Sequence, residues 1–220
     1  MYVKINGLIL IKKNIKEKSA LIYILTQELG IIKARIDGIN RSESKLISVI
    51  QPGVWGRFFL VSELNFFKIL SFLPFKIPIK VFKKFPYSYL WALRFLRYFS
   101  LFSVSSTFFN QIINLDYYLL KHKKTFLIWF LNSIFEELGI TPNLTHCSKC
   151  NRQLSGDVYY RGAKFYCYRC RKPSYEKIDA QFYKNLVFYY KNNKLLYIKD
   201  KKLIDFLKRI FKSHLKEINL

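Results

Sequence analysis

Four cysteines, arranged as two closely spaced pairs, constrain this sequence more than any other feature. Cys147 and Cys150 form the first pair, and Cys167 and Cys170 follow after sixteen intervening residues. Two residues between thiolates let both sulfurs of a pair reach one ion, and a hairpin between the pairs would bring them opposite each other. The spacing predicts a closed four-sulfur zinc site. Such a site leaves no position for water or substrate, so the predicted role of the metal is structural.

The start of the chain predicts a compartment in which these thiols stay reduced. The opening Met1-Tyr2-Val3-Lys4-Ile5 lacks the basic start, apolar run and cleavage site of a secretory signal. We therefore expect a cytoplasmic protein, in which disulfides are rare. His146 adjoins the first cysteine, but four sulfurs already complete a tetrahedron. We expect this histidine to be a neighbour of the site and not a ligand.

Residues 2–72 carry the pattern of short β-strands, because β-branched and aromatic runs alternate with turn clusters. The predicted strands are Val3–Ile11, Ala20–Leu25, Ile31–Ile36, Leu46–Val61 with a break at Pro52-Gly53, and Phe66–Phe72. Five short strands favour a small closed barrel of the oligonucleotide-binding (OB) type. Lys33 and Arg35 are two residues apart on the third strand, so both should lie on one face, opposite the core.

The remaining sequence is predicted to be helical on both sides of the cysteine segment. Helical spacing covers Tyr87–Ser100 and Thr125–Leu138, and Asp200 is positioned to cap a C-terminal helix with one apolar stripe and one lysine face. That lysine face is either simply solvated or in contact with DNA. The predicted fold class is α+β with several domains. They are an OB-fold barrel (1–80), a first helical part (81–146), an inserted four-cysteine zinc module (147–172) and a second helical part (173–220) that packs on the first.

The charge of the chain indicates a polyanionic partner. It has 38 Lys and Arg against 14 Asp and Glu, a formal net charge of +24, while its 51% hydrophobic residues exclude a disordered polymer. The four predicted parts carry net charges of +8, +4, +6 and +6 in chain order. A surface that follows a long phosphate backbone therefore fits better than one basic tail.

Catalytic motifs are missing from the sequence. No histidine has a glutamate two residues later, as zinc deaminases require, and no glycine precedes a lysine, as in a P-loop. The adjacent pair Glu136-Glu137 would project about 100° apart on a helix, so we expect it to decorate a surface. The uncharged run Tyr98–Leu115 reaches membrane-spanning length but contains many Ser, Thr, Asn and Gln residues. We expect neither an enzyme nor a membrane protein.

Several segments, taken in their order and spacing, resemble the bacterial RecO family. They are Gly7–Leu10, Leu25–Gly30, Asp37–Arg41, the run from Leu46 to Pro52, and Glu137–Leu144 leading into Cys147. The resemblance covers about residues 3 to 170. It implies a DNA repair and recombination mediator that binds single- and double-stranded DNA and anneals complementary strands. The implied partners are these DNA forms, RecR and the C-terminal tail of single-strand-binding protein. Together with RecR, such a mediator lets the recombinase RecA replace single-strand-binding protein on DNA. The implied place in the cell is the nucleoid.

The resemblance also implies DNA-binding positions on the barrel. Carried over by position, they are Lys33, Arg35, Arg41 and Lys45. The sequence departs from the family pattern at Asp37, which precedes Gly38 where the family has a base. We therefore expect weaker binding by the barrel and compensation by other bases. The compensating residues are predicted to be either Lys12, Lys13, Lys16 and Arg57 on the barrel, or Lys149, Arg152, Arg161, Lys164, Arg169 and Arg171 on the zinc module.

Three alternative functions fit parts of the same sequence. A zinc-ribbon protein that binds RNA or the ribosome shares the charge and the metal. A peripheral membrane protein would use the basic aromatic surface on acidic lipid. A nuclease would need acidic residues that converge only in three dimensions.

Overall fold

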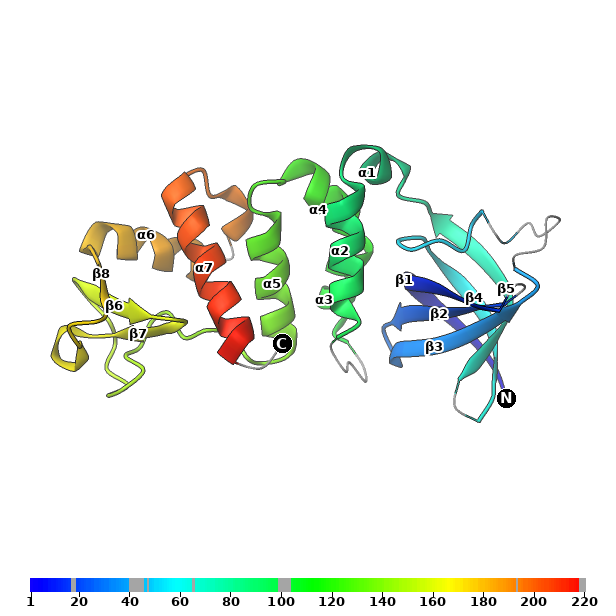
Figure 1. Cartoon of the computed structure of the whole chain (residues 1–220), viewed down its shortest axis with the longest axis horizontal. Helices are drawn as coiled ribbons and strands as arrows, with labels where there is room; N and C mark the ends of the chain where they lie inside the picture. Colours follow the sequence, from blue (N-terminus) through cyan, green and yellow to red (C-terminus); the bar gives the residue numbers. More distant parts are fainter. Residues whose placement is uncertain are drawn as a thin grey trace. The chain divides into compact units, whose positions relative to one another are not determined.

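The structure is a computed structural model of the 220-residue chain (Figure 1). It describes residues 1–16, 19–39, 46, 48–64, 66–98, 104–192 and 194–217. The predicted DNA-binding residues Arg41 and Lys45 lie outside these residues, and only the backbone of Lys16 is described. The chain divides into two compact units, Met1–Lys121 and His122–Leu220. The four-part domain division stays a prediction.

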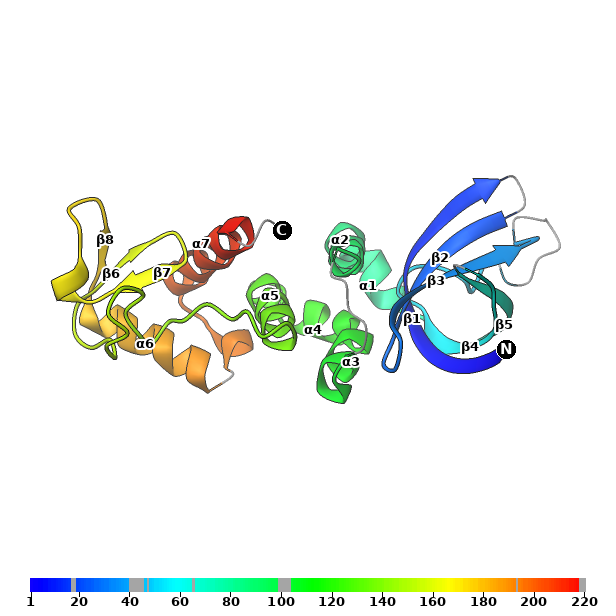
Figure 2. The same cartoon turned by 90° about the horizontal axis from the view of Figure 1, so that it is seen from below.

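The first unit begins with a closed five-stranded barrel. Its strands are β1 (Tyr2–Lys16), β2 (Ser19–Thr26), β3 (Gly30–Asp37), β4 (Trp55–Ser62) and β5 (Phe67–Lys76). They neighbour one another in the order β1-β2-β3-β5-β4, and Figure 2 shows them curving into a ring. Neighbouring strands are antiparallel except for a short parallel contact of two residue pairs between β3 and β5. The predicted OB-like barrel is confirmed.

Alternation along the strands fills the barrel with branched apolar side chains. On β3, for example, Ile32, Ala34 and Ile36 are buried, while the residues between them point outward. The rings of Phe58 and Phe72 stack in this core with their centroids 4.4 Å apart. The core therefore rests on the two-residue period of the strands, as the sequence pattern indicated.

Gly56 on β4 lies where the barrel has no room for a side chain. A Cβ there would lie 2.3 Å from the carbonyl oxygen of Leu73 and 2.6 Å from the ring of Phe72. The backbone oxygen cannot rotate away, so we expect Gly56→Ala to lower the free energy of unfolding by about 1–3 kcal/mol. Urea denaturation measures this loss, and Ser71→Ala, at an exposed position of β5, is the control. Equal stability of the two variants would contradict the close packing.

The predicted strand from Leu46 to Val61 is wrong in its first half. The described residues there, 46 and 48–54, form turns, and β4 begins only at Trp55. The N–H of Ile50 donates to the carbonyl of Leu46 at 2.9 Å, which closes a turn. Gly53 has a positive φ of 84° and donates its N–H to the carbonyl of Ile9 at 2.7 Å. Val49, Ile50 and Val54 thus pack in or against the barrel core without joining the sheet.

Among its described residues, four helices complete the first unit. They are α1 (Ile79–Lys84), α2 (Pro86–Leu96), α3 (Ser106–Ile113) and α4 (Leu115–Lys121). Pro86 occupies the first turn of α2, where its missing N–H costs nothing, and Ser105 caps α3 by accepting a hydrogen bond from the N–H of Phe108. Lys76 at the end of β5 forms an ion pair with Asp116 of α4 at 2.6 Å. This ion pair ties the helices to the barrel.

In the part of the second unit that the structure describes, three helices are combined with a small sheet. Its elements are α5 (Phe126–Glu137), β6 (Val158–Arg161), β7 (Lys164–Tyr166), the 3-10 turn η1 (Tyr168–Cys170), β8 (Glu176–Ile178), α6 (Ala180–Lys191), η2 (Leu195–Tyr197) and α7 (Lys201–Glu217). α5 packs on α7, where the rings of Phe135 and Phe211 meet edge to face at 5.6 Å. Asp200 accepts a hydrogen bond from the N–H of Lys202 at 2.8 Å, as its predicted capping role requires. Within the described residues, we find no helix with the length and apolar character that crossing a bilayer demands.

Candidate metal centre and nucleic-acid interface

The four predicted metal ligands converge in the second unit. The sulfur atoms of Cys147, Cys150, Cys167 and Cys170 all lie within 4.8 Å of one another, and those of Cys150 and Cys167 are 3.8 Å apart. A zinc ion with four bonds of about 2.3 Å holds its sulfurs about 3.8 Å apart in a tetrahedron. The four clustered cysteines can therefore bind a metal such as zinc.

Local hydrogen bonds shape both cysteine turns. In the first, the N–H of Cys147 donates to the carbonyl of Arg152 at 2.8 Å, and Asn151 takes a positive φ of 53°. In the second, the N–H of Cys170 donates to the carbonyl of Cys167 at 3.0 Å within η1. The hairpin of β6 and β7 joins the two turns, and Ser148 pairs with Phe165 through its N–H and its hydroxyl oxygen. These hydrogen bonds thus hold the two cysteine turns close to each other.

The thiol pKa values show why this cluster suits a cation. Burial raises the pKa of the Cys147 thiol, but neighbouring backbone N–H groups, first that of Cys167, outweigh it and lower the pKa to about 6. Desolvation, followed by contacts with the other three thiols, raises the pKa of Cys170 to about 12. Thiols this close ionise one after another unless a positive charge compensates them. A divalent ion supplies that charge and makes all four thiolates stable together.

His146 is a neighbour of the sulfur cluster. Its Nδ1 lies 2.9 Å from the hydroxyl oxygen of Thr145, which occupies that ring nitrogen. Among the described residues, the group that could hold a metal contains only the four cysteines. A metal held by all four sulfurs would have no open position for water or substrate.

The outer surface of strands β1, β2 and β3 carries the predicted barrel cations. Lys33 and Arg35 alternate with buried residues on β3, as expected, and Lys33 is exposed. Lys13 of β1 lies opposite Leu21, which in turn lies opposite Arg35. Residues directly opposite on neighbouring strands share a face, so Lys13, Lys33 and Arg35 belong to one basic barrel face.

Two further cations and a tyrosine extend this face. Lys68 of β5 lies beside Arg35 across the parallel contact, and Tyr23 lies opposite Lys33. The guanidinium of Arg97, which follows α2, lies 4.9 Å from the ring centre of Tyr23. Sequence reasoning missed these residues because strand pairing, which no local pattern shows, brings them here. The basic barrel face therefore comprises Lys13, Tyr23, Lys33, Arg35, Lys68 and Arg97.

A groove lies beside the basic barrel face. It has a volume of about 420 Å³ and runs between β3, with Ile31 and Lys33, and the turn that joins β4 to β5, with Leu64 and Phe66. OB-fold proteins bind oligonucleotides at the corresponding strands and loops. The geometry of the barrel thus places cations and apolar groups where this fold class holds its ligands.

Comparison with known families agrees with the geometry of the barrel. Residues 1–72 match the family model described as recombination protein O N terminal. These residues form a RecO N-terminal domain. A search of curated proteins returned no match to the chain.

Asp37 modifies the basic face of the RecO N-terminal domain. Its carboxylate accepts a hydrogen bond from the guanidinium of Arg35 at 2.8 Å and lies 3.5 Å from the ammonium of Lys68. Desolvation raises the pKa of Asp37, but the Ser19 hydroxyl and these two cations outweigh it and lower the pKa. The carboxylate therefore stays ionised and neutralises part of the face. Lys13 and Lys33 are left as its stronger phosphate-binding candidates.

Lys12 and Arg57 lie apart from this face of the RecO N-terminal domain. The partner of Lys12 on β2 is the buried Ile22, so its side chain is on the inner side, and burial lowers its pKa. Arg57 of β4 donates to the side-chain oxygen of Asn6 at 3.1 Å and lies over the ring of Phe75 at 5.3 Å. The strand register places neither residue opposite Lys33 or Arg35, and their predicted compensating role stays a prediction.

The predicted cations of the cysteine segment are all exposed. They are Lys149, Arg152, Arg161, Lys164, Arg169 and Arg171. Arg161 and Lys164 lie opposite each other across the hairpin, and Arg171 lies over the ring of Tyr168 with its guanidinium 3.7 Å from the ring centre. These positions can contact phosphate without any rearrangement of the core.

Proposed function

We propose that this chain is a RecO-type recombination and repair mediator that binds single- and double-stranded DNA and anneals complementary strands. The observation that carries the proposal is the RecO N-terminal domain with Lys13 and Lys33 on the face and beside the groove that OB folds use. Phosphate contacts position a strand without reading its sequence. Base pairing between the two strands then supplies all the specificity that annealing needs.

The charge of the two units supports a role in bringing two strands together. Met1–Lys121 contains 18 basic and 6 acidic residues, and His122–Leu220 contains 20 and 8, so each carries a net charge of +12. Two phosphate backbones repel each other, and cations that contact both reduce this repulsion. Annealing breaks no covalent bond, so the proposed function is not enzymatic. The proposed zinc ion has a structural role in the second unit.

The proposed protein partners are RecR and the C-terminal tail of single-strand-binding protein. For an acidic, apolar tail, the second unit offers a groove of about 360 Å³ beside α6. Val187 and Phe188 supply apolar walls, and Lys184 and Lys191 supply positive charge without an acidic residue in the lining. This composition complements the proposed tail, and we propose the groove as its binding site.

A strand-annealing assay on DNA coated with single-strand-binding protein tests the proposed function. The test variant is Lys13→Glu/Lys33→Glu, which leaves Arg35 in place because reversing it would unpair Asp37. We expect annealing to slow about tenfold, since two phosphate contacts become repulsive. The control is Lys80→Glu/Lys84→Glu, which changes the same charge at exposed positions of α1.

The outcome separates this function from its alternatives. Equal annealing rates for the two double variants would remove the basic barrel face as the site. Tighter binding to structured RNA than to single-stranded DNA, measured by competition, would favour the RNA-binding alternative. Flotation with acidic liposomes in the absence of DNA binding would favour a membrane surface.

A further inference from the structure

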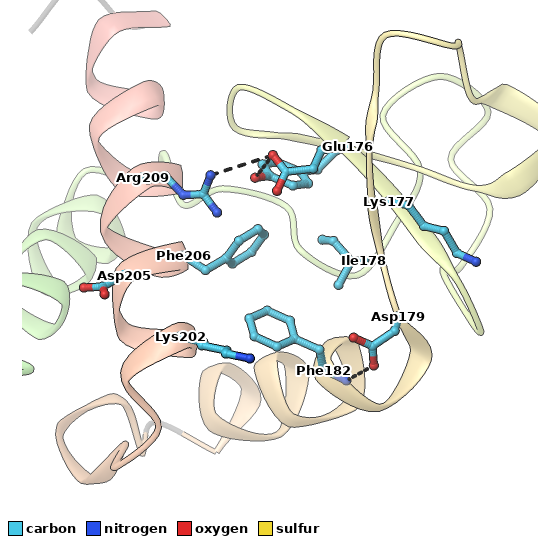
Figure 3. A pocket seen from close by; sticks show the side chains of 10 residues that line it. Glu176, Lys177, Ile178, Asp179, Phe182, Lys202, Asp205, Phe206 and Arg209 are labelled. Atoms are coloured by element: carbon cyan, nitrogen blue, oxygen red, sulfur yellow. Dashed lines mark hydrogen bonds and ion pairs between the residues drawn. The ribbon is translucent and has the colours of Figure 1, made fainter.

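The three-stranded sheet of the second unit, ordered β7-β6-β8, has one packed face. Tyr160 and Phe165 point to this inner face, where Tyr160 meets the ring of Phe206 of α7 edge to face at 4.7 Å. Phe206, Phe182 and Ile178 line a pocket of about 510 Å³. Figure 3 shows these three side chains close to one another in its wall. Three carboxylates, Glu176, Asp179 and Asp205, are among its lining residues. Three cations, Lys177, Lys202 and Arg209, line the same pocket, so its acidic and basic groups balance.

The opposite face of the sheet presents tyrosines and cations. Tyr159 of β6 lies between Tyr166 of β7 and Lys177 of β8 in the register of the sheet. Arg161 and Lys164 are the next opposed pair on the same face. This alternation leaves the outer face basic and aromatic, in contrast to the packed inner face.

Two ring stacks extend the outer face beyond the strands. The ring of Tyr166 stacks on that of Tyr175 with centroids 4.4 Å apart. Arg171 lies over Tyr168 at 3.7 Å and donates a hydrogen bond to the hydroxyl of Tyr159 at 3.1 Å. We call the whole set the tyrosine face. It comprises Tyr159, Arg161, Lys164, Tyr166, Tyr168, Arg171, Tyr175 and Lys177.

Tyr168 is the most accessible ring of the tyrosine face. Tyr168 is 61% exposed. Such exposure leaves the apolar ring, whose burial would be favourable, in contact with water. Arg171 orients this ring by stacking on it, and the planar guanidinium offers a further stacking surface. Exposed aromatic rings next to cations are the features with which proteins hold unpaired bases, because the rings stack on bases while the cations contact phosphates.

The chemistry of the tyrosine face distinguishes between nucleic-acid forms. In a duplex, the ring faces of the bases are stacked on one another and are not available to a protein. In a single strand, they can turn outward and stack on tyrosine or on an arginine plane. Asp157, which lies next to this face, is ion-paired with Lys177 at 2.6 Å, so its charge is compensated.

We propose that the tyrosine face is a binding site for the unpaired bases of a single-stranded nucleic acid, with Tyr168 and Arg171 as its stacking platform. The proposal rests on the proposed function in that the ligand is a nucleic-acid strand. It adds a second nucleic-acid site, which lies on the second unit, whereas the basic barrel face lies on the first. It also assigns this second site to single-stranded nucleic acid. Phosphate contacts alone would not distinguish a single strand from a duplex.

The test compares Tyr168→Ala with Tyr168→Phe in the full zinc-loaded chain. Binding of a fluorescent oligothymidine and of a DNA duplex of equal length is measured by anisotropy. Losing one base–aromatic stack should weaken binding of the single strand about 5- to 160-fold and leave the duplex within about twofold. Tyr168→Phe should bind like the wild type. Tyr197→Ala, at a tyrosine of the same unit that is 60% exposed, is the matched control and should not change either affinity.

A zinc assay shows whether Tyr168→Ala disturbs the neighbouring metal ligands. If it does, Arg171→Lys serves as the second test variant. This variant retains the positive charge but lacks the planar guanidinium, so we expect it to weaken single-strand binding selectively. Equal losses for single strand and duplex, or no loss in either variant, would overturn the platform. With intact binding by the wild type, that result would leave the proposed function standing. A wild type that binds neither DNA form would overturn both proposals.

Discussion

Removal of zinc is expected to unfold the cysteine segment of the second unit while the barrel stays folded. The cysteine turns have few apolar residues of their own, and their four sulfurs lie within 4.8 Å of one another. Without a cation, four thiols at this distance lose their shared partner and the two turns separate. Structural zinc contributes about 10–16 kcal/mol of binding free energy in small zinc domains, more than a segment of this size can replace.

Chelation followed by hydrogen exchange measures this effect. Amides of β6, β7 and η1 should lose protection, whereas those of β1 to β5 should keep it, because the barrel has its own core in the other unit. Cys150→Ser should reproduce the loss without a chelator. His146→Ala is the control and should retain the metal, since its ring is not a ligand. Unchanged protection after complete loss of zinc would contradict a structural role.

Affinity for single-stranded DNA is expected to fall steeply with salt. If about six phosphates are neutralised, the slope of log affinity against log salt is about −4, from about 0.7 per contact. Between about 50 and 200 mM salt, affinity then falls about 250-fold. The net charge of +12 on each unit supplies enough cations for this number of contacts.

The same titration assigns part of the slope to the basic barrel face. Lys13→Glu/Lys33→Glu should make the slope shallower by about 1.4, the value for two contacts. Lys80→Glu/Lys84→Glu, on α1, should leave the slope of the wild type. A wild-type slope near zero would remove the electrostatic account of binding, and equal slopes for the two variants would move the contacts elsewhere.

Local patterns predicted the elements well where the governing interactions are local. The period of two on β3 correctly placed Lys33 and Arg35 opposite Ile32 and Ala34. The capping position of Asp200 and the apolar stripe of α7 depend on residues three or four apart, which sequence shows directly. The strand predicted to begin at Leu46 was wrong in its first half because a local pattern cannot show a long-range contact. Its β-branched residues favour a strand, but the turn at Gly53 and its contact with Ile9 keep it out of the sheet.

Lys12 and Lys13 show what a pattern cannot decide. The register between β1 and β2 shifts between Ile9 and Ile11, so one extra residue is accommodated there. This bulge reverses which residues face outward along the rest of β1. Lys13 therefore lies on the basic barrel face, and Lys12 turns inward beside Ile22. Two adjacent lysines thus lie on opposite faces of the same strand.

The sequence alone determined the five-stranded barrel, the helical parts and the four-cysteine site of this protein, because short-range periodicity and spacing encode all three. Only the tertiary structure decided that Asp37 neutralises Arg35 and Lys68, that Lys12 is turned inward, and that Tyr159 lies beside Arg171. These relations depend on strand register and on contacts between separate elements. The physical reason is that side chains acquire their electrostatic partners only when the backbone hydrogen bonds of the sheets fix which residues lie side by side.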